Sequence, residues 1–474
     1  MSALHRAASI AGNELRRLLR ERLARTLGLL GASLLLLSLG LGLVREGQTA
    51  ERQGDYAARA DRDWNAQPDR HPHRVVHAGD FVFKTPGPLS RIDWGIESQV
   101  GRSVFLEGHR QNTANFSDAA LSGGLLRLGD LSPSLVVQQW LPLLMLLAGA
   151  ASLAGERQSG VLATSLIGGA RGAELLFGKA AALWAFGLLM ALPAFLALLW
   201  AATTQPALAA RAAGLGASFT AVLGLAALGT VLVSSLARSV LGALLAGVVA
   251  WFALVAVAPR AVASWAELSV PAPTQAEVEQ RIAMALAKIG DAHDPNSAHF
   301  AAFRQRVLDE YGVSRVEDLP VNFGGLVMLE GERLTTAAIA AEVDRQRDAW
   351  QAQADRASAF GWIVPTLAIR SLSQAFAGTD LAHHRDFLDQ AERRRFATVQ
   401  ALNQLHATRI AALNDRDQKL DASQWADIPR ADIALPALRR AAPSLAATVA
   451  PVGAWLLLGL VALGWLGRGL ERRA

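Results

Sequence analysis

The side chains of this 474-residue chain that could bind a metal ion are mainly histidines. His71, His73 and His77 stand close together, and His109 follows further along. A tetrahedral metal site needs three or four ligands that converge in space. Spacing alone does not show such convergence, and surface or hydrogen-bonded histidines give the same pattern. We therefore predict no metal site and keep these four residues as candidates.

Motifs for catalysis are absent from the sequence. There is no cysteine, which excludes disulfides, thiol nucleophiles and cysteine-ligated metals. The patterns G-x-x-x-x-G-K-[ST] for nucleotides, H-E-x-x-H for zinc proteases and G-x-S-x-G for serine hydrolases do not occur. We predict that the chain is not an enzyme and holds no cofactor of its own. If ATP drives it, the ATPase is another chain.

A short charged loop, residues 155–179, lies between two strongly apolar segments. Within it Val161, Leu162 and Leu166 fall on one face of a short helix that the glycine pair 168–169 would end. A short helix with an exposed apolar face can insert into a groove on a partner. A plain basic connection between two helices is the alternative, although it would not need that face. This loop is therefore the strongest functional candidate.

The elements that position this loop are membrane helices. Hydrophobic residues make up 52% of the chain and gather into long runs, which membrane spans explain better than soluble domains do. We predict an all-α polytopic membrane protein with six transmembrane helices. The spans are expected at residues 26–44, 134–154, 180–203, 213–235, 240–258 and 445–467.

Arg238 marks the turn between the fourth and fifth spans. As one helix, the apolar stretch 212–258 would be about 70 Å long, more than twice the ~30 Å of a membrane core. An arginine at mid-bilayer costs about 2.5–3.5 kcal/mol, so the chain turns back at the only charge in this stretch. The other spans hold no ionisable residue, which argues against a proton-driven carrier.

The polar segments outside the spans differ in size and character. Residues 1–25 are predicted to form a basic amphipathic helix in the membrane interface, with the positive flank of a signal anchor as the alternative. Residues 45–133 are a first insert, expected to hold loops with a few short strands and helices. Residues 259–442 are a larger, mostly helical second insert, and residues 468–474 are a tail.

Local signals predict helices in the second insert. Thr274 and Glu277 have the spacing of a capping box at a helix start. Gly312 is a typical helix stop. Apolar residues recur every three to five positions over 388–413, which predicts a long amphipathic helix. Two further histidines, at 383–384, lie just before that segment.

The distribution of charge predicts which side of the membrane each segment occupies. The N-terminal flank, the 155–179 loop and the tail are strongly basic, whereas the two inserts are slightly acidic. Short basic segments stay in the cytoplasm. We therefore expect a multi-pass protein of the bacterial inner membrane, with both termini cytoplasmic and both inserts periplasmic. The net charge of +5 does not by itself imply nucleic acid, and we expect no nucleic-acid partner.

The loop carries the pattern E-R-x-x-G-x-L, followed by R-x-x-E-L-x-x-G-K. With the six-span plan, it resembles ABC-2 type permeases, in which this loop is a coupling helix seated on an ATPase subunit. The segments 71–112 and 365–396 are similar to a subgroup with large extracytoplasmic domains of unknown function, grouped with permeases linked to multi-copper-enzyme maturation. The residues assigned to coupling are Glu156, Arg157, Gly160, Val161, Leu162, Leu166, Arg171, Glu174 and Lys179.

The resemblance implies the membrane subunit of a bacterial ABC exporter. Two ATPase subunits carrying ATP and Mg²⁺, a second permease chain (identical or paralogous) and membrane lipids would be its partners, and a periplasmic partner is possible. One alternative is a mechanotransmitter that moves its inserts against that periplasmic partner. Another is a membrane-anchored copper-handling factor. The sequence does not name a substrate.

Overall fold

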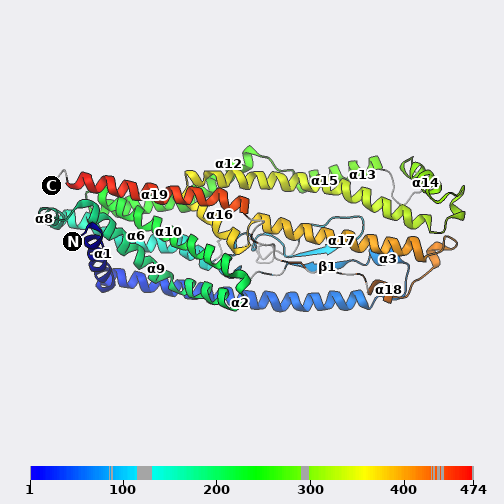
Figure 1. The fold of residues 1–474 in the computed structure, drawn as a ribbon, viewed down its shortest axis with the longest axis horizontal. Coiled ribbons are helices and arrows are strands. Elements are labelled where there is room, and N and C mark those ends of the chain that lie inside the picture. Colours follow the sequence, from blue (N-terminus) through cyan, green and yellow to red (C-terminus); the bar gives the residue numbers. More distant parts are fainter. Residues whose placement is uncertain are drawn as a thin grey trace.

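The computed structural model of the chain describes residues 2–84, 86, 89–114, 131–289, 298–426, 428, 430, 433–434, 438 and 442–471. It is a long, narrow assembly of helices that run along a common axis (Figure 1). The N- and C-termini lie together at one end. We call that half the membrane bundle and the opposite half the distal module.

Among the described residues, six helices are long and apolar enough to cross a membrane, which confirms the predicted all-α membrane class. Several are built from consecutive helical pieces. They are α2 (Arg22–Asn65), the run α5 (Pro133–Leu135), η2 (Val136–Trp140), α6 (Leu141–Gly149) and α7 (Ala151–Ser159), then α9 (Gly172–Thr204), η3 (Pro206–Leu208) with α10 (Ala209–Leu236), α11 (Val240–Phe252) with η4 (Ala253–Val257) and α12 (Ala258–Ser269), and α19 (Ala442–Glu471).

The bundle is packed around α9 and α10. Met145, Phe186, Phe219 and Leu223 are among its fully buried side chains. The chain turns between α10 and α11 at an exposed Arg238, as expected. The charge therefore stays at the helix ends, where water or a partner can reach it.

The N-terminal helix α1 (Ala3–Arg20) is amphipathic, as predicted, but it is not an isolated surface helix. It packs along α9, with Leu18 1% exposed and Glu14 7% exposed. Leu4 faces outward at 83% exposure. One face of α1 is thus part of the bundle and the other is open.

The distal module is mostly helical. Its two longest members, α15 (Phe323–Ala359) and α17 (Leu381–Arg409), lie side by side (Figure 1). The remaining helical elements are shorter. They are α3 (Pro72–Val76), α13 (Gln275–Ile289), α14 (Ala298–Tyr311), η5 (Val316–Asp318), η6 (Phe360–Trp362), η7 (Asp415–Asp417) and α18 (Ser423–Ala426). The segment α16 (Pro365–Ala377) comes from the second insert but packs in the bundle against α10 and α19.

The local helix signals in the second insert are confirmed. The Thr274 backbone N–H donates to Glu277 Oε2 at 2.7 Å and the Glu277 N–H donates to Thr274 Oγ1 at 3.3 Å, which forms the capping box before α13. Gly312 follows the last residue of α14 with φ +66. The amphipathic segment forms α17, which ends at Arg409.

The first insert differs from the expected mixture of loops and short elements. Helix α2 continues without a break from the membrane segment to Asn65. Residues 45–65 are rich in alanine and arginine, which favour helix, and the next proline is Pro68. Only after that do short elements follow, including the antiparallel pair β1 (Asp80–Phe83) and β2 (Ser103–Leu106).

The two halves are joined by a buried arginine at the start of α10. Arg211 is 4% exposed, and its Nη1 donates to the carbonyls of Ala375 and Phe376 at 3.3 Å, at the end of α16. It also lies 3.3 Å from Nε2 of His383. Cations stabilise the unpaired carbonyls of a helix C-terminus, so Arg211 locks α16 onto the bundle.

From His384, which follows His383 in the chain, we predict that the stability of the protein depends on pH. Burial lowers the pKa of His384 to about 3, and the charges of Lys84 and Arg347 act in the same direction. The unfolded state has a pKa near 6.5 and binds the proton first, so stability falls as the pH drops from about 6.5 towards 3. Through this residue alone, the free energy of unfolding at pH 5.5 is about 1.4 kcal/mol lower than at a pH well above 6.5.

Thermal unfolding of the purified protein between pH 8 and pH 5.5 tests this. The variant His384→Gln should show a shallower fall in stability than the wild type. The variant His299→Gln, at a histidine whose side chain is 36% exposed, should not. Equal slopes for wild type and His384→Gln would contradict the expectation.

Candidate functional site

The 155–179 loop forms a sharp elbow at the end of the bundle that holds both termini (Figure 1). Helix α7 ends at Ser159, and Gly160 takes φ +79 before α8 (Val161–Ile167) begins. Glycine adopts this left-handed conformation without the strain a side chain would add. The glycine pair 168–169 then ends α8, with Gly169 at φ +89, as predicted.

The apolar residues of α8 do not share one exposed face. Leu162 is 5% exposed and packs with Leu153, Leu175 and Leu176, and Leu166 is partly buried against the same cluster. The expectation that Leu162 and Leu166 are exposed together with Val161 is therefore wrong. A seven-residue helix on a bundle must use one face to stay attached, and these two leucines provide it.

The exposed apolar side chains of α8 are Val161, at 49% exposure, and Ile167, at 80%. Ile167 was not singled out from the sequence, although it lies in the same apolar segment. An apolar side chain this exposed at the tip of a membrane protein suits contact with a partner.

Two sets of charged residues hold the elbow in place. Arg6 of α1 makes a bidentate contact with Glu174 of α9, with distances of 2.8 and 2.6 Å. Lys179 is 3% exposed, and its Nζ lies 2.8 Å from Glu156 Oε1 and 3.4 Å from Glu14 Oε2. Paired groups of this kind resist displacement because separating them leaves a buried charge. The elbow is thus fixed to α1 as well as to α9.

Arg157 fixes the elbow to a third helix. Its guanidinium donates to the carbonyls of Ala237 at 2.5 Å and Ser235 at 2.7 Å, which close the C-terminus of α10. Of the polar coupling residues, Arg171 is the exposed one. Most of the recognised pattern therefore serves to mount α8, and Gly160, Val161 and Arg171 are its most exposed members.

The sequence did not identify α1 as a partner of this loop. Arg6 and Glu14 lie more than a hundred residues from their partners in the chain. The available signal was Glu14, a carboxylate inside an otherwise basic helix. A carboxylate in that position calls for a cation nearby when the helix is buried.

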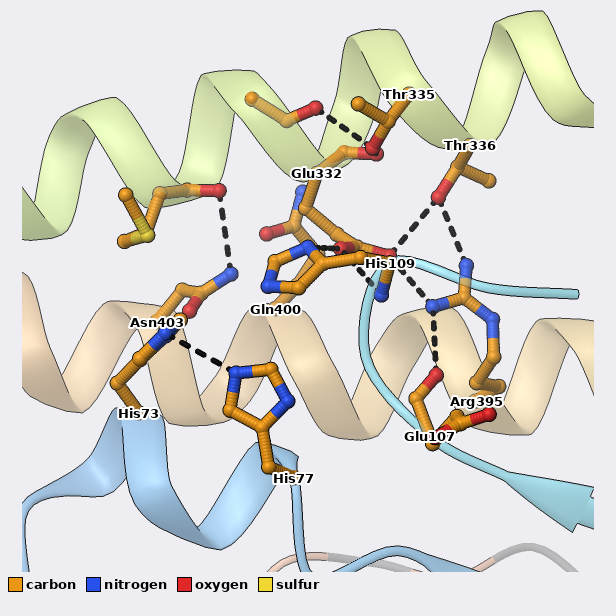
Figure 2. Close-up of polar contacts among 12 residues, drawn as sticks. His73, His77, Glu107, His109, Glu332, Thr335, Thr336, Arg395, Gln400 and Asn403 are labelled. Carbon is orange, nitrogen blue, oxygen red and sulfur yellow. Dashed lines mark hydrogen bonds and ion pairs between the residues drawn. The ribbon is translucent and has the colours of Figure 1, made fainter. Parts of the chain in front are cut away.

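A second candidate site lies in the distal module, where three of the four candidate histidines meet (Figure 2). His73 and His77 are four residues apart across α3, and their Nε2 atoms are 3.2 Å apart. The His109 ring lies 5.7 Å from that of His73 and 5.4 Å from that of His77, centre to centre. One ring nitrogen from each histidine lies within 4.8 Å of the other two.

His109 contacts a buried ion pair formed by Glu332 and Arg395. Glu332 of α15 is 0% exposed, and its Oε2 lies 2.9 Å from His109 Nδ1. Its Oε1 lies 2.5 Å from Arg395 Nη1 of α17. Burial raises the pKa of Glu332, but the hydrogen bond from His109 and the charge of Arg395 outweigh it and hold the pKa at about 2. Glu332 is therefore ionised at neutral pH.

The fourth candidate, His71, belongs to a separate cluster. Its Nε2 lies 2.9 Å from Asp415, and Nε2 of His406 lies 2.9 Å from the same carboxylate. His71 contacts Oδ1 of Asp415 and His406 contacts Oδ2, and Asn322 donates to Oδ2 at 2.8 Å. His71 Nδ1 accepts the His73 backbone N–H at 3.2 Å. Both ring nitrogens of His71 are thus used in ordinary hydrogen bonds.

Comparison with known proteins covers the second insert only. A family model described as "Domain of unknown function (DUF3526)" matches residues 274–431. This range includes Glu332 and Arg395 as well as the His406–Asp415 cluster. Searches among curated proteins and among solved structures find no match.

The buried pair predicts a large effect of one substitution. Glu332→Gln removes the negative charge and breaks the pair with Arg395, which is 2% exposed at its side chain and keeps Glu392 as its remaining carboxylate partner. Breaking a buried pair in this way costs about 3–5 kcal/mol. We expect a clear drop in the thermal unfolding temperature of the purified protein.

Glu342→Gln on the same helix is the matched control, because Glu342 pairs with Arg345, whose side chain is 54% exposed. Pairs of that kind contribute about 0–1 kcal/mol. If the two variants lost the same stability, the pair between α15 and α17 would not have the role assigned to it.

Proposed function

We propose that this chain is the membrane-spanning subunit of an ABC-2 type transporter, driven by a separate ATPase. The observation that carries the proposal is the elbow helix α8. It presents Val161 and Ile167 outward at the end of the bundle that holds both termini. It packs on the bundle through Leu162 and Leu166, and the two helices on either side of it, α7 and α9, are held to α10 and α1 by the contacts described above. Such a helix can receive a movement and pass it to the spans.

In this proposal the elbow faces the cytoplasm of a bacterial inner membrane, where the basic short segments belong, and the distal module lies in the periplasm. Two ATPase subunits carry the ATP and Mg²⁺, and a second permease chain, identical or paralogous, completes the assembly. Closure of the ATPases displaces α8. Because Glu174 and Lys179 of α9 pair with α1, and Lys179 also pairs with Glu156 of α7, the helices around the elbow move as a rigid body.

An apolar cavity within the bundle supports transport. It has a volume of about 520 Å³ and lies between α6, α10, α11 and α19. Its lining includes Leu146, Val222, Trp251 and Leu458. Concave apolar sites of this size suit small, largely hydrophobic molecules. The cargo class that we propose is therefore an apolar or amphipathic molecule, moved outward in line with the family resemblance.

Substitution at the tip of α8 tests the ATPase contact. With an ABC-type ATPase of the same cell co-expressed, Ile167→Asp should reduce its co-purification with the chain at least about tenfold, since a buried charge at an apolar contact costs more than 1.4 kcal/mol. Leu413→Asp is the control, because Leu413 is 81% exposed in the distal module.

The readout is the ratio of ATPase to permease chain by quantitative mass spectrometry. Leu162→Asp is not suitable, because Leu162 is buried and its loss would disturb the elbow itself. Full retention of the ATPase by Ile167→Asp together with Val161→Asp would refute the proposed contact.

A mechanotransmitter is the second candidate function, and helix α2 favours it. Its 44 residues give a length of about 66 Å, about twice the thickness of a membrane core. The same helix therefore crosses the bundle and reaches β1 in the distal module. A movement at one end is available at the other without passing through a flexible loop.

Because the chain has no cysteine, two dyes can be placed at Leu268→Cys and Leu413→Cys, both 81% exposed. In the ATPase-bound complex, a mechanotransmitter should show an ATP-dependent change in energy transfer between them. Asp55→Pro, which breaks α2 beyond the membrane segment, should reduce that change, and Asp55→Ala should not. No change on adding ATP would remove this candidate.

A further inference from the structure

We propose that His73, His77 and His109 bind one divalent transition-metal ion, with Zn²⁺ as the best fit. The proposal concerns the distal module and does not depend on whether the bundle transports a cargo. Three imidazoles from two separate segments of the first insert, α3 and the loop after β2, point towards a common centre (Figure 2).

The distances between the histidines suit a tetrahedral ion. Zinc holds imidazole nitrogens at about 2.0–2.1 Å, so two of its ligands lie about 3.4 Å apart in tetrahedral geometry. The Nε2 atoms of His73 and His77 are 3.2 Å apart. Two histidines four residues apart on one helical face are a recurring zinc-binding arrangement. The third ligand nitrogen, from His109, lies within 4.8 Å of the other two.

Glu332 places His109 as metal ligands are usually placed. A histidine that binds a metal normally gives its other ring N–H to a carboxylate, which fixes the tautomer and the orientation of the ring. His109 Nδ1 lies 2.9 Å from Glu332 Oε2, so Nε2 is the ring nitrogen that would bind an ion. Arg395 holds Glu332 from the opposite side at 2.5 Å, so this carboxylate cannot easily turn towards the ion and replace the histidine.

The backbone of His109 is a second, independent observation. It takes φ +63, a conformation that is uncommon for residues other than glycine. Backbone strain of this kind persists where the surroundings impose it and is concentrated at ligand sites. Here it turns the imidazole back from the end of β2 towards α3.

The composition of the site determines the class of ion. Three neutral imidazoles suit zinc, copper(II) or nickel, whereas calcium and magnesium prefer oxygen ligands. His77 is exposed and His73 is partly exposed, so an ion can enter from solvent and a water molecule can take the fourth position. Bound there, the ion would join α3 to the loop after β2 and hold both against α15.

The His71–His406–Asp415 cluster is the competing site. Its carboxylate already receives hydrogen bonds from both histidines and from Asn322. An ion there would have to displace the contacts of both histidines with the carboxylate. In the His73 cluster an ion would replace the contact between His73 and His77, and it would be held by three imidazoles, so we place the ion there.

The test is a Zn²⁺ titration of the full-length protein in detergent after treatment with a chelator, in competition with a chromophoric chelator. We expect one Zn²⁺ per chain, with no competition from Mg²⁺ or Ca²⁺. His77→Ala removes an exposed ligand with little effect on packing. His109→Gly removes the other ligand and suits the positive φ. Each variant should weaken binding by about 100-fold or more.

Two control variants make the result specific. His299→Ala, at a histidine whose side chain is 36% exposed, should bind as the wild type does, and so should His406→Gln. Co²⁺ in the wild type should give the strong visible absorption of a tetrahedral site. The proposal fails if the wild type takes up no stoichiometric Zn²⁺, if binding survives both His77→Ala and His109→Gly, or if His406→Gln alone abolishes it.

Discussion

The distal module depends on one buried ion pair, between Glu332 and Arg395. Charges with side-chain exposures of 0% and 2% are tolerated in a protein interior only when they are paired and hydrogen-bonded. Thr336 Oγ1 donates to the same oxygen of Glu332 that Arg395 contacts, and Glu392 accepts from Arg395. A shift of α15 along α17 by one turn, about 5.4 Å, would separate Arg395 from both Glu332 and Thr336, so the pair fixes how the two helices are aligned. The same carboxylate orients His109. The geometry of the cluster of His73, His77 and His109 therefore depends on this alignment.

The sequence predicted what local physics determines. Six apolar helices, the turn at Arg238, the capping box at Thr274 and the stop at Gly312 follow from residues that are neighbours in the chain. Helix α2 was placed too short at its C-terminal end. Its boundary was drawn where hydrophobicity ends, at residue 44, whereas helix formation depends on propensity and continues to Asn65.

What could not be predicted are contacts between residues far apart in the sequence. Glu332 stands 223 positions from His109, and no local pattern marks it as the partner. For the same reason the four candidate histidines could not be divided into two clusters. The elbow shows a related difficulty. Periodicity correctly grouped Leu162 and Leu166 on one face of α8, but it could not tell whether that face meets the bundle or a partner. The bundle covers it, and Ile167 on the other side is left exposed.

The unbroken course of α2 has a mechanical consequence. The part of the helix beyond residue 44 is 21 residues long when counted to Asn65, or about 32 Å. It is long enough to serve as a lever arm with its pivot in the apolar span. A tilt of about 10° in the span would move its tip sideways by about 5 Å, a distance similar to one helical turn. Because Trp64 near the tip packs in the same buried cluster as Val75 and Val76 of α3, the arm would carry with it the helix on which His73 stands.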